Sequence, residues 1–179
     1  NKSVIDLNKY YLLKLEILTN LTEIYDDKTK FEVLEAERFL KNNGWKIIKL
    51  IKQKLYETSN LKLMFHLIRI INTLEYLTGR LEKDYEKIMI RCLSCKEPWI
   101  RKEAIISISK FQRKDKDGLI LLLNPMLKDS IPEVRLTTAR VLAKNLDCYN
   151  GFRIIAKELK SSKNWKIKLA AIKALAYME

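Results

Sequence analysis

The sequence predicts an all-α protein, a right-handed α-solenoid in which about ten helices are arranged in pairs. Helices are favoured because only four glycines and three prolines interrupt the 179 residues. A hydrophobic content of 47% is sufficient for a packed core. Pairing is favoured because one pattern of residues recurs at intervals of 33 to 34 positions, which is typical of stacked helix pairs.

The recurring pattern begins with an aliphatic residue followed by a base, as in Ile100-Arg101, Val134-Arg135 and Ile167-Lys168. Small or apolar residues follow four and eight positions after the aliphatic one. Because residues four apart lie on one side of an α-helix, each copy forms a buried stripe. The predicted stripes are Ile100/Ala104/Ile108, Val134/Thr138/Leu142 and Ile167/Ala171/Leu175, with a fainter copy at Leu63/Leu67/Ile71.

Helix boundaries follow from the turn residues between the apolar stripes. We expect each glycine to close a helix in the left-handed conformation, and we expect a capping box at Ser130 to Glu133. Pro98 is placed well for the first turn of a helix. The predicted helices span residues 3–25, 29–42, 45–57, 60–77, 82–94, 98–112, 117–128, 131–146, 151–160 and 163–178, and the four glycines are Gly44, Gly79, Gly118 and Gly151.

The segments PWIRKEAIISI, PEVRLTTARVL and NWKIKLAAIKAL resemble HEAT repeats, whose first helix carries an aliphatic-basic pair followed by a small residue. The resemblance is good over residues 96–179, moderate over 60–95 and poor before that. We therefore expect one solenoid over residues 1–179, with divergent helices in 1–59 and clearer HEAT-like repeats in 60–179. Because the first residue is Asn1, we also expect a fragment of a longer chain.

The bases of the repeated pairs, Arg101, Arg135 and Lys168, occupy one repeat position. They are expected to form a structural ladder that hydrogen-bonds the turns of adjacent repeats; the alternative is contact with the backbone of a ligand. Trp45, Trp99 and Trp165 occupy different repeat positions, so we expect them to fill gaps between helices rather than to stack on bases.

The formal net charge is +13, and it is unevenly distributed. Residues 1–37 carry 5 Lys/Arg against 8 Asp/Glu, which leaves +16 on the remainder. A surface that faces a polyanion explains this balance. A compositional bias explains it too, because 26 of the 35 bases are lysine and the chain is rich in Ile and Asn, as AT-rich coding would produce.

Basic residues recur on the second helices of the pairs, which line the concave binding surface in HEAT-like arrays. Their spacing places each set on one side of its helix. Lysine attracts phosphate without reading base sequence, so any nucleic-acid binding is expected to be sequence-independent. The alternative is an ordinary solvated face. The predicted polyanion-binding residues are Lys46, Lys49, Lys52, Lys83, Lys87, Arg91, Arg153, Lys157 and Lys160.

Nothing in the sequence points to catalysis. His66 is the one histidine, Cys92 and Cys95 form a CxxC without a second pair, and no phosphate-binding loop is present. The segment WIRKEAIISISKF resembles part of the HEAT-like alkylpurine DNA glycosylases, which would assign Arg101 to the DNA backbone. The aspartate of that family has no counterpart in LMFHLIRIINTLEYL, so a glycosylase is a remote alternative. We expect no enzyme activity, no cofactor and no metal.

The expected function is a non-catalytic binding module with a basic groove for a polyanion, and the expected polyanion is nucleic acid in a nuclear or chromatin-type assembly. The alternative is a protein scaffold that binds an acidic or apolar surface, with the apolar segment 117–128 as the first suspect. The sequence contains no apolar run long enough to span a membrane and no signal peptide. Three cysteines without a disulfide framework favour the nucleus or cytoplasm.

Overall fold

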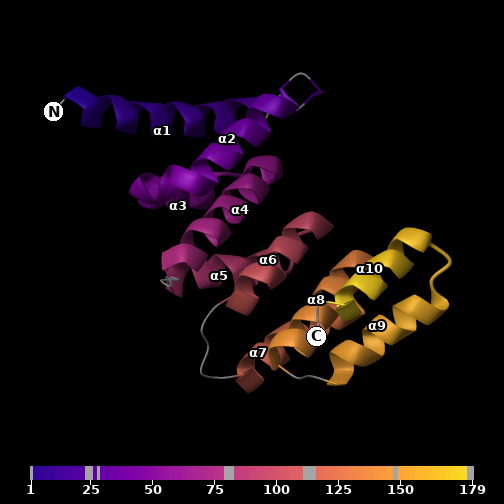
Figure 1. Ribbon diagram of the computed structural model, residues 1–179. Coiled ribbons are helices and arrows are strands. Elements are labelled where there is room, and N and C mark those ends of the chain that lie inside the picture. The colour runs from indigo at the N-terminus through magenta and orange to yellow at the C-terminus, as the bar shows by residue number, and fades with distance from the viewer. Residues whose placement is uncertain are drawn as a thin grey trace. The chain divides into compact units, whose positions relative to one another are not determined.

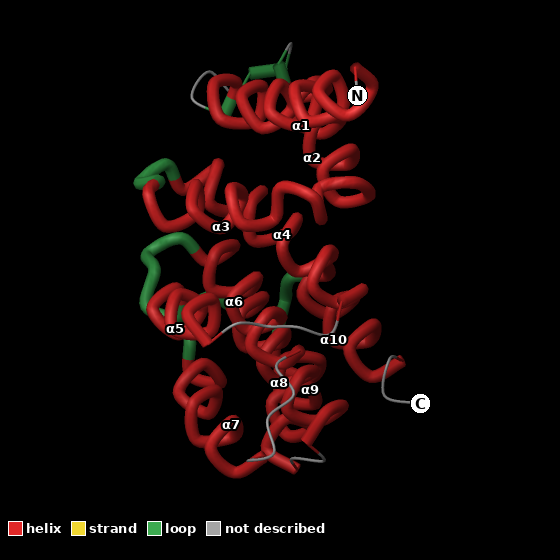
Figure 2. The backbone as a smooth tube through the Cα atoms, turned by 90° about the vertical axis from the view of Figure 1, so that its left-hand side faces the viewer, coloured by secondary structure: helices red, strands yellow, loops and turns green. Residues whose placement is uncertain are grey.

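The computed structural model describes residues 2–22, 26–27, 29–78, 83–110, 116–146 and 149–176, and these residues form helices and connecting turns without any strand (Figures 1 and 2). The all-α class is therefore confirmed. The α-helices are α1 (Lys2–Leu21), α2 (Lys30–Asn43), α3 (Ile48–Glu57), α4 (Leu61–Thr78), α5 (Lys83–Cys92), α6 (Pro98–Lys110), α7 (Lys116–Leu123), α8 (Pro132–Leu146), α9 (Tyr149–Ser161) and α10 (Trp165–Ala176).

The chain divides into two compact units, residues 1–85 and residues 86–179, with the division inside α5. In the first unit, α2 packs against both α1 and α4, and α3 packs against α4. The core of this unit contains the stripe Leu63/Leu67/Ile71 of α4, all of which is buried as its helical spacing predicts. The faint upstream copy of the repeat is therefore a real core stripe.

In the second unit, α8 is the central helix and packs against α6, α7, α9 and α10 (Figure 1). Helices α6, α8 and α10 carry the repeated aliphatic-basic pair, and α8 lies between the other two. Helix α9 packs against both α8 and α10. The three predicted stripes are buried in these helices with one exception, Leu175 of α10, which remains exposed.

Two short 3-10 helices adjoin α3 and α7. η1 (Gly44–Ile47) precedes α3, and η2 (Asn124–Lys128) follows α7. The sequence predicted one continuous helix in each of these regions, over 45–57 and 117–128. In the second case Pro125 provides the reason, because its ring lacks an N–H and prevents the α-helical hydrogen-bond pattern from continuing past Leu123.

The glycines fit their predicted role only in part. Gly44 closes α2 as predicted, and its N–H donates to the carbonyl oxygen of Leu40. Gly44 has a φ of −72° and opens η1, so it is not in the left-handed conformation. Gly118 and Gly151 lie in the first turns of α7 and α9 instead of closing the preceding helices. Gly79 lies outside the described residues.

Gly151 has a different function, which is to let α9 approach α8 closely. A Cβ atom at this position would lie 2.4 Å from the carbonyl oxygen of Ala139 and 3.0 Å from the Cβ of Ala143. Only a residue without a side chain fits between these two backbones. The position of α9, and of the basic side chains that it carries, therefore depends on this glycine.

Candidate polyanion-binding surface

Helix α9 separates a buried face from an exposed basic face. Gly151, Ile155 and Glu158 are buried toward the unit, whereas Arg153, Lys157 and Lys160 are exposed. The three bases follow one another at four and three positions, so they lie on one side of the helix, over about 10 Å of its length. The predicted stripe on this helix is thus an exposed row of positive charge.

Phe152 adds an aromatic ring beside this row. Its side chain is 40% exposed although it is a large apolar residue. Proteins that bind single-stranded nucleic acid use aromatic side chains to stack unpaired nucleobases and neighbouring Lys or Arg side chains to hold the phosphates. Phe152 was not predicted from the sequence, because one aromatic residue on an amphipathic helix is typical of the core. The phenylalanine directly before Arg153 was the available signal.

The exposed charged side chains of the second unit are mostly positive. Residues 86–179 contain 20 Lys/Arg and 10 Asp/Glu, a formal charge of +10. Among the side chains described there, thirteen exposed ones are basic, whereas only Asp117 and Glu133 are exposed acids. The surface of this unit therefore offers many cations for each anion. The thirteen bases are Lys87, Arg91, Lys96, Lys110, Lys128, Lys144, Arg153, Lys157, Lys160, Lys163, Lys166, Lys168 and Lys173.

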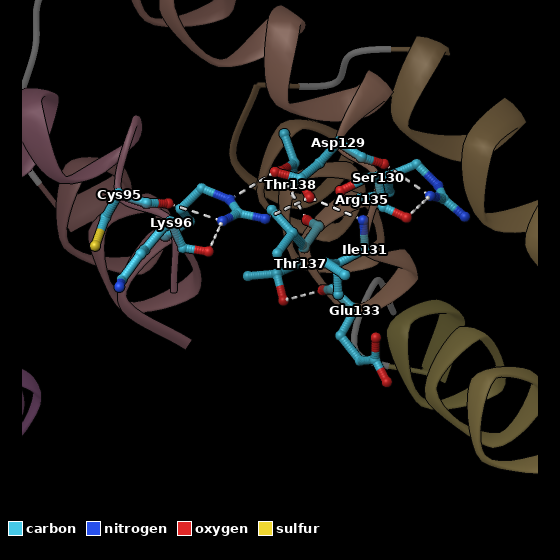
Figure 3. Close-up of polar contacts among 11 residues, drawn as sticks. Cys95, Lys96, Asp129, Ser130, Ile131, Glu133, Arg135, Thr137 and Thr138 are labelled. Carbon is cyan, nitrogen blue, oxygen red and sulfur yellow. Dashed lines mark hydrogen bonds and ion pairs between the residues drawn. The ribbon is translucent and has the colours of Figure 1, made fainter. Parts of the chain in front are cut away.

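Two acidic residues of this unit, Asp129 and Glu158, form ion pairs with arginines instead of facing solvent. The two carboxylate oxygens of Asp129 accept hydrogen bonds from Nε and Nη2 of Arg101, at 2.7 and 2.8 Å. Nη1 of the same arginine donates to the carbonyl oxygens of Cys95 and Lys96, at 2.8 and 2.9 Å (Figure 3). Arg101 thereby connects the turn before its own helix α6 to the turn before α8.

Arg135 of α8 repeats this geometry. Its Nη1 donates to the carbonyl oxygens of Asp129 and Ser130, which precede it by the same six and five positions (Figure 3). Its Nε and Nη2 both contact Oε1 of Glu158 on α9, each at 2.6 Å. The chain Arg101–Asp129–Arg135–Glu158 is therefore a ladder that connects α6, α8 and α9.

The ladder also explains the protonation of its members. Burial alone would raise the pKa of Asp129, but the hydrogen bond from Arg101, the Ile131 N–H and the neighbouring positive charge lower it. The hydrogen bond to Asp129 raises the pKa of Arg101 in spite of its burial. Both groups stay charged at neutral pH, and their charges are neutralised internally.

The third base of the repeated pairs behaves differently. Lys168 is exposed on α10, and among the described residues its side chain makes no hydrogen bond or ion pair like those of Arg101 and Arg135. A lysine cannot replace an arginine here, because its single ammonium group does not offer the planar fork that reaches two carbonyls and a carboxylate together. The ladder geometry thus describes Arg101 and Arg135, whereas Lys168 belongs to the exposed charge.

The basic residues predicted on the first unit differ from one another in exposure. Lys46 and Lys49 are exposed, and the ammonium group of Lys46 lies 5.4 Å from the ring centroid of Trp45. Lys52 is only 7% exposed, so it does not extend this row at the surface. Its position three residues after Lys49 brings it toward the buried side of the amphipathic helix α3, where Ile51 and Leu55 also lie.

The stripe predicted on α5 is described in part. Lys87 and Arg91 are exposed and one helical turn apart, while the side chain of Lys83 lies outside the described residues. The row on α9 is the one stripe whose three predicted members are all described and exposed, so it is the centre of the candidate surface.

A cleft of about 370 Å³ between α6, α8 and α10 is also lined by bases, but its charge is mixed. Lys102, Arg140 and Lys173 line it together with Glu103 and Glu133. Two carboxylates beside three bases leave little net attraction for a polyanion. The cleft is therefore not included in the candidate surface.

The tryptophans do not all fill gaps between helices, as the sequence analysis expected. Trp45 and Trp165 are 59% and 67% exposed. Trp99 is partly buried, and its indole N–H donates to the carboxylate of Glu97 at 3.1 Å. The expectation was wrong for the two exposed rings because helical spacing does not show which helix has a neighbour on a given side.

His66 belongs to a buried ion cluster that the sequence analysis did not foresee. The carboxylate of Glu37 on α2 contacts His66 Nδ1, the ammonium group of Lys41 and, at 3.4 Å, Nε of Arg69. Burial would raise the pKa of Glu37, but the hydrogen bonds from His66 and Lys41 lower it to about 2. The cluster connects α2 to α4, and its histidine and glutamate are buried.

The cysteines of the CxxC segment differ in exposure, because Cys92 is buried and Cys95 is half-buried. Burial, together with the neighbouring Cys95, raises the pKa of Cys92 to about 11, so its thiol stays protonated at neutral pH. Within the described residues, no group of three or more His, Cys, Asp or Glu side chains is arranged to hold a metal ion.

The apolar segment 117–128 is buried along one side. Leu119, Leu123 and Leu127 lie in the core, whereas Leu121 is 72% exposed. One exposed leucine is common at protein surfaces and does not make a docking patch. None of the described helices has the length and apolar character that crossing a membrane requires.

Comparison with known proteins gives no relative for this chain: no protein family, no curated protein and no solved structure matches it.

Proposed function

We propose that this chain is a HEAT-like, right-handed α-solenoid that acts as a non-catalytic binding module for nucleic acid. The observation that carries the proposal is the exposed basic row Arg153, Lys157 and Lys160 on α9, with Phe152 beside it. Such a surface provides positive charge for phosphates and a ring for bases. The setting we propose is a nuclear or chromatin-type assembly.

The repeated packing of the second unit supports the solenoid. Helices α6, α8 and α10 carry the same residue pattern, and each packs on the next. Arg101 and Arg135 bind their own preceding turns with identical offsets in sequence. Equivalent contacts at equivalent positions are what stacked repeats require.

The same contacts argue against a glycosylase-type role for Arg101. Its guanidinium already donates to two carbonyl oxygens and two carboxylate oxygens. Contact with a DNA backbone would require it to leave these buried partners, which costs several kcal/mol when a buried ion pair is broken. We therefore place nucleic-acid contact on α9 and leave Arg101 in the ladder.

The distribution of charge supports a polyanion over a small anion. The row on α9 extends about 10 Å, while the phosphates of one B-form strand follow one another at about 3.4 Å along the axis. Helix α10, which packs against α9, adds two further exposed bases to this unit, Lys166 and Lys168. Because lysine ammonium groups act as point charges, we expect binding without preference for base sequence.

The test is fluorescence anisotropy with labelled single-stranded and double-stranded DNA and with single-stranded RNA. We expect a dissociation constant on the order of micromolar near physiological salt for the unaltered chain. The variant Arg153→Glu/Lys157→Glu/Lys160→Glu is expected to bind at least about tenfold more weakly, because each reversal replaces a phosphate contact by repulsion.

A matched control makes the same change of charge elsewhere in the same unit. The variant Lys96→Glu/Lys128→Glu/Lys110→Glu reverses three exposed bases that lie outside α9. We expect it to bind clearly better than the α9 variant. Equal loss in both variants would show that total charge, and not the α9 row, determines affinity, and absence of binding by the unaltered chain would refute the proposed function.

A further inference from the structure

Helix α10 carries an apolar face that the described residues leave exposed. Trp165, Leu169 and Ile172 are 67%, 41% and 51% exposed, and Ala176 is exposed as well. These four residues follow one another at four, three and four positions, which is the spacing by which one helix presents a seam to another. Large apolar side chains grouped in this way mark an interaction surface. We call these four residues the α10 face.

The contact of α9 with α8 shows what covers the equivalent positions of α8. The residues 33 positions before the last three members of the α10 face are buried, and they are Leu136, Ala139 and Ala143. Gly151 of α9 lies against two of them, because a Cβ atom at this glycine would clash with the Ala139 carbonyl oxygen and lie 3.0 Å from the Ala143 Cβ. On α8, this face is therefore covered by a helix.

The same contact has an ion pair at its border. Nε of Arg135, near the start of α8, lies 2.6 Å from Oε1 of Glu158 on α9. Gly151 precedes Glu158 but contacts the later part of α8, so the two helices run antiparallel. Lys168 stands 33 positions after Arg135 and is exposed. Helix α10 therefore has a cation, without a described carboxylate beside it, at the place where α8 has a paired one.

The charged residues that border the α10 face are all basic. Lys166 and Lys173 lie on one side of it and Lys168 on the other, as their helical positions require. The ammonium group of Lys166 lies 5.8 Å from the ring centroid of Trp165. From residue 151 to residue 176 the one carboxylate is that of Glu158, which is buried. A complementary partner therefore brings carboxylates to both borders.

We propose that the α10 face binds an amphipathic helix of another protein, in which acidic residues flank an apolar stripe. This helix lies antiparallel to α10, and one of its carboxylates pairs with Lys168 as Glu158 pairs with Arg135. Nucleic acid is not the expected occupant, because phosphates gain nothing from an apolar seam. Pairing of two α10 faces is disfavoured, because it would bring the lysines of both copies together. The proposal is independent of nucleic-acid binding by α9.

The test measures the binding of two labelled synthetic peptides by fluorescence anisotropy, with protein freed of nucleic acid. Both peptides are helices of about three heptads with leucine at a and d, and they carry either glutamate or lysine at e and g. For the glutamate peptide we expect a dissociation constant on the order of micromolar near physiological salt. The lysine peptide is expected to bind at least about tenfold more weakly.

Two variants of α10 locate the binding. Leu169→Asp/Ile172→Asp is expected to abolish it, whereas Leu121→Asp changes an exposed leucine on α7 and is expected to bind like the unaltered chain. These side chains are exposed, so the variants are expected to fold, which circular dichroism checks. Lys168→Ala is expected to weaken binding of the glutamate peptide more than Lys163→Ala, which removes an exposed lysine before α10.

Reversal of the border charges distinguishes docking from general attraction to a basic protein. Lys166→Glu/Lys168→Glu/Lys173→Glu is expected to prefer the lysine peptide by at least about tenfold. The charge-reversal control introduced for α9 makes the same change of charge elsewhere in the unit and is expected to keep its preference for the glutamate peptide. Equal affinity for both peptides, or binding that survives the loss of the apolar seam, would overturn the proposal.

Two other occupants of the α10 face would give different results. A lipid surface would be indicated by binding to vesicles of phosphatidylserine and phosphatidylcholine that is lost in Leu169→Asp/Ile172→Asp, without binding of either peptide. A second copy of the chain would be indicated by a dimer in sedimentation velocity that the same variant abolishes. Either result would overturn the proposal.

Discussion

The guanidinium of Arg101 and the carboxylate of Asp129 form a two-pronged ion pair, with N–O distances of 2.7 and 2.8 Å between α6 and the turn that precedes α8. The carbonyl oxygen of Asp129 accepts a further hydrogen bond from Arg135 at 2.7 Å. One aspartate therefore binds the arginines of both α6 and α8, and the packing of these two helices depends on it.

Removal of this aspartate is expected to destabilise the second unit strongly. Asp129→Ala leaves the guanidinium of Arg101 buried without its carboxylate, which costs about 3 to 5 kcal/mol for a buried pair. Urea unfolding monitored by circular dichroism measures this loss. The exposed Asp117→Ala should change the free energy of unfolding by less than about 0.5 kcal/mol. Similar effects of the two changes would contradict the ladder.

A double-mutant cycle separates the ion pair from the other bonds of Arg101. In the background of Arg101→Ala, the change Asp129→Ala should cost much less, because its partner has already gone. We expect a coupling free energy of at least about 1 kcal/mol between the two positions. Additive effects would mean that the two side chains act independently.

The buried carboxylate of Glu37 is expected to make the first unit sensitive to acid. Its pKa is about 2 in the folded chain, below the ordinary value of 4.5. The resulting stabilisation, on the order of 3 kcal/mol, is fully present above about pH 4.5 and is lost as the pH falls toward 2. The stability advantage of the unaltered chain over Glu37→Gln should therefore shrink between pH 5 and pH 2.5. An advantage that does not change with pH would show that Glu37 has an ordinary pKa.

Gly151 is expected to tolerate no side chain. In Gly151→Ala the new methyl group would lie 2.4 Å from the carbonyl oxygen of Ala139, so α9 must move away from α8. Overpacking of this kind costs about 1 to 3 kcal/mol, which thermal unfolding detects. Gly44→Ala is the control, since its nearest neighbours are side-chain methyl groups of Ile51 and Leu74, at 3.1 and 3.3 Å. A greater loss at Gly44 would be inconsistent with the described packing.

Phe152 is expected to contribute to the binding of single strands more than to that of duplexes. Phe152→Ala should weaken the binding of single-stranded DNA by about 1 kcal/mol or more, because a stacked base loses its platform. The change should affect duplex binding little, since paired bases are not free to stack on the ring. Phe152→Trp retains an aromatic surface and should retain the affinity. Unchanged single-strand binding by Phe152→Ala would exclude stacking at this ring.

Helix positions were predictable from the sequence because they depend on local periodicity. The predicted segments 98–112, 131–146 and 163–178 correspond to α6, α8 and α10 within a few residues at each end. The aliphatic-basic pairs also indicated which residues of these helices form the core. The exception, Leu175, is exposed because its burial would require a further helix beside α10, which local spacing cannot show.

The partners in the ladder were not predictable, because they depend on contacts between distant turns. Asp129 and Glu158 follow their arginines by 28 and 23 residues, so no fixed offset identifies them. Ser162 stands 33 residues after Asp129, and its hydroxyl accepts the Asn164 N–H as Asp129 accepts the Ile131 N–H. Because serine has no carboxylate, Ser162 cannot pair with Arg135 as Asp129 pairs with Arg101. Glu158 on α9 provides the carboxylate for Arg135 instead.

Asp129 also corrects the predicted start of α8. The sequence placed a capping box at Ser130 to Glu133, but the side-chain acceptor at this end is Asp129, which binds the Ile131 N–H at 2.9 Å. Serine and aspartate are both common before helices, so the spacing to Glu133 alone could not distinguish them. The carboxylate of Asp129 is held beside the Ile131 N–H because it also accepts hydrogen bonds from Arg101.

The central claim, that the α9 row contacts phosphates, is tested most directly by the salt dependence of binding. The logarithm of the association constant for single-stranded DNA is measured against the logarithm of the salt concentration, for the unaltered chain and for Arg153→Gln/Lys157→Gln/Lys160→Gln. Each lost phosphate contact reduces the slope by about 0.7, so we expect a slope shallower by about 2 in the variant. An identical slope in both proteins would show that these three side chains meet no phosphate and would contradict the proposed function.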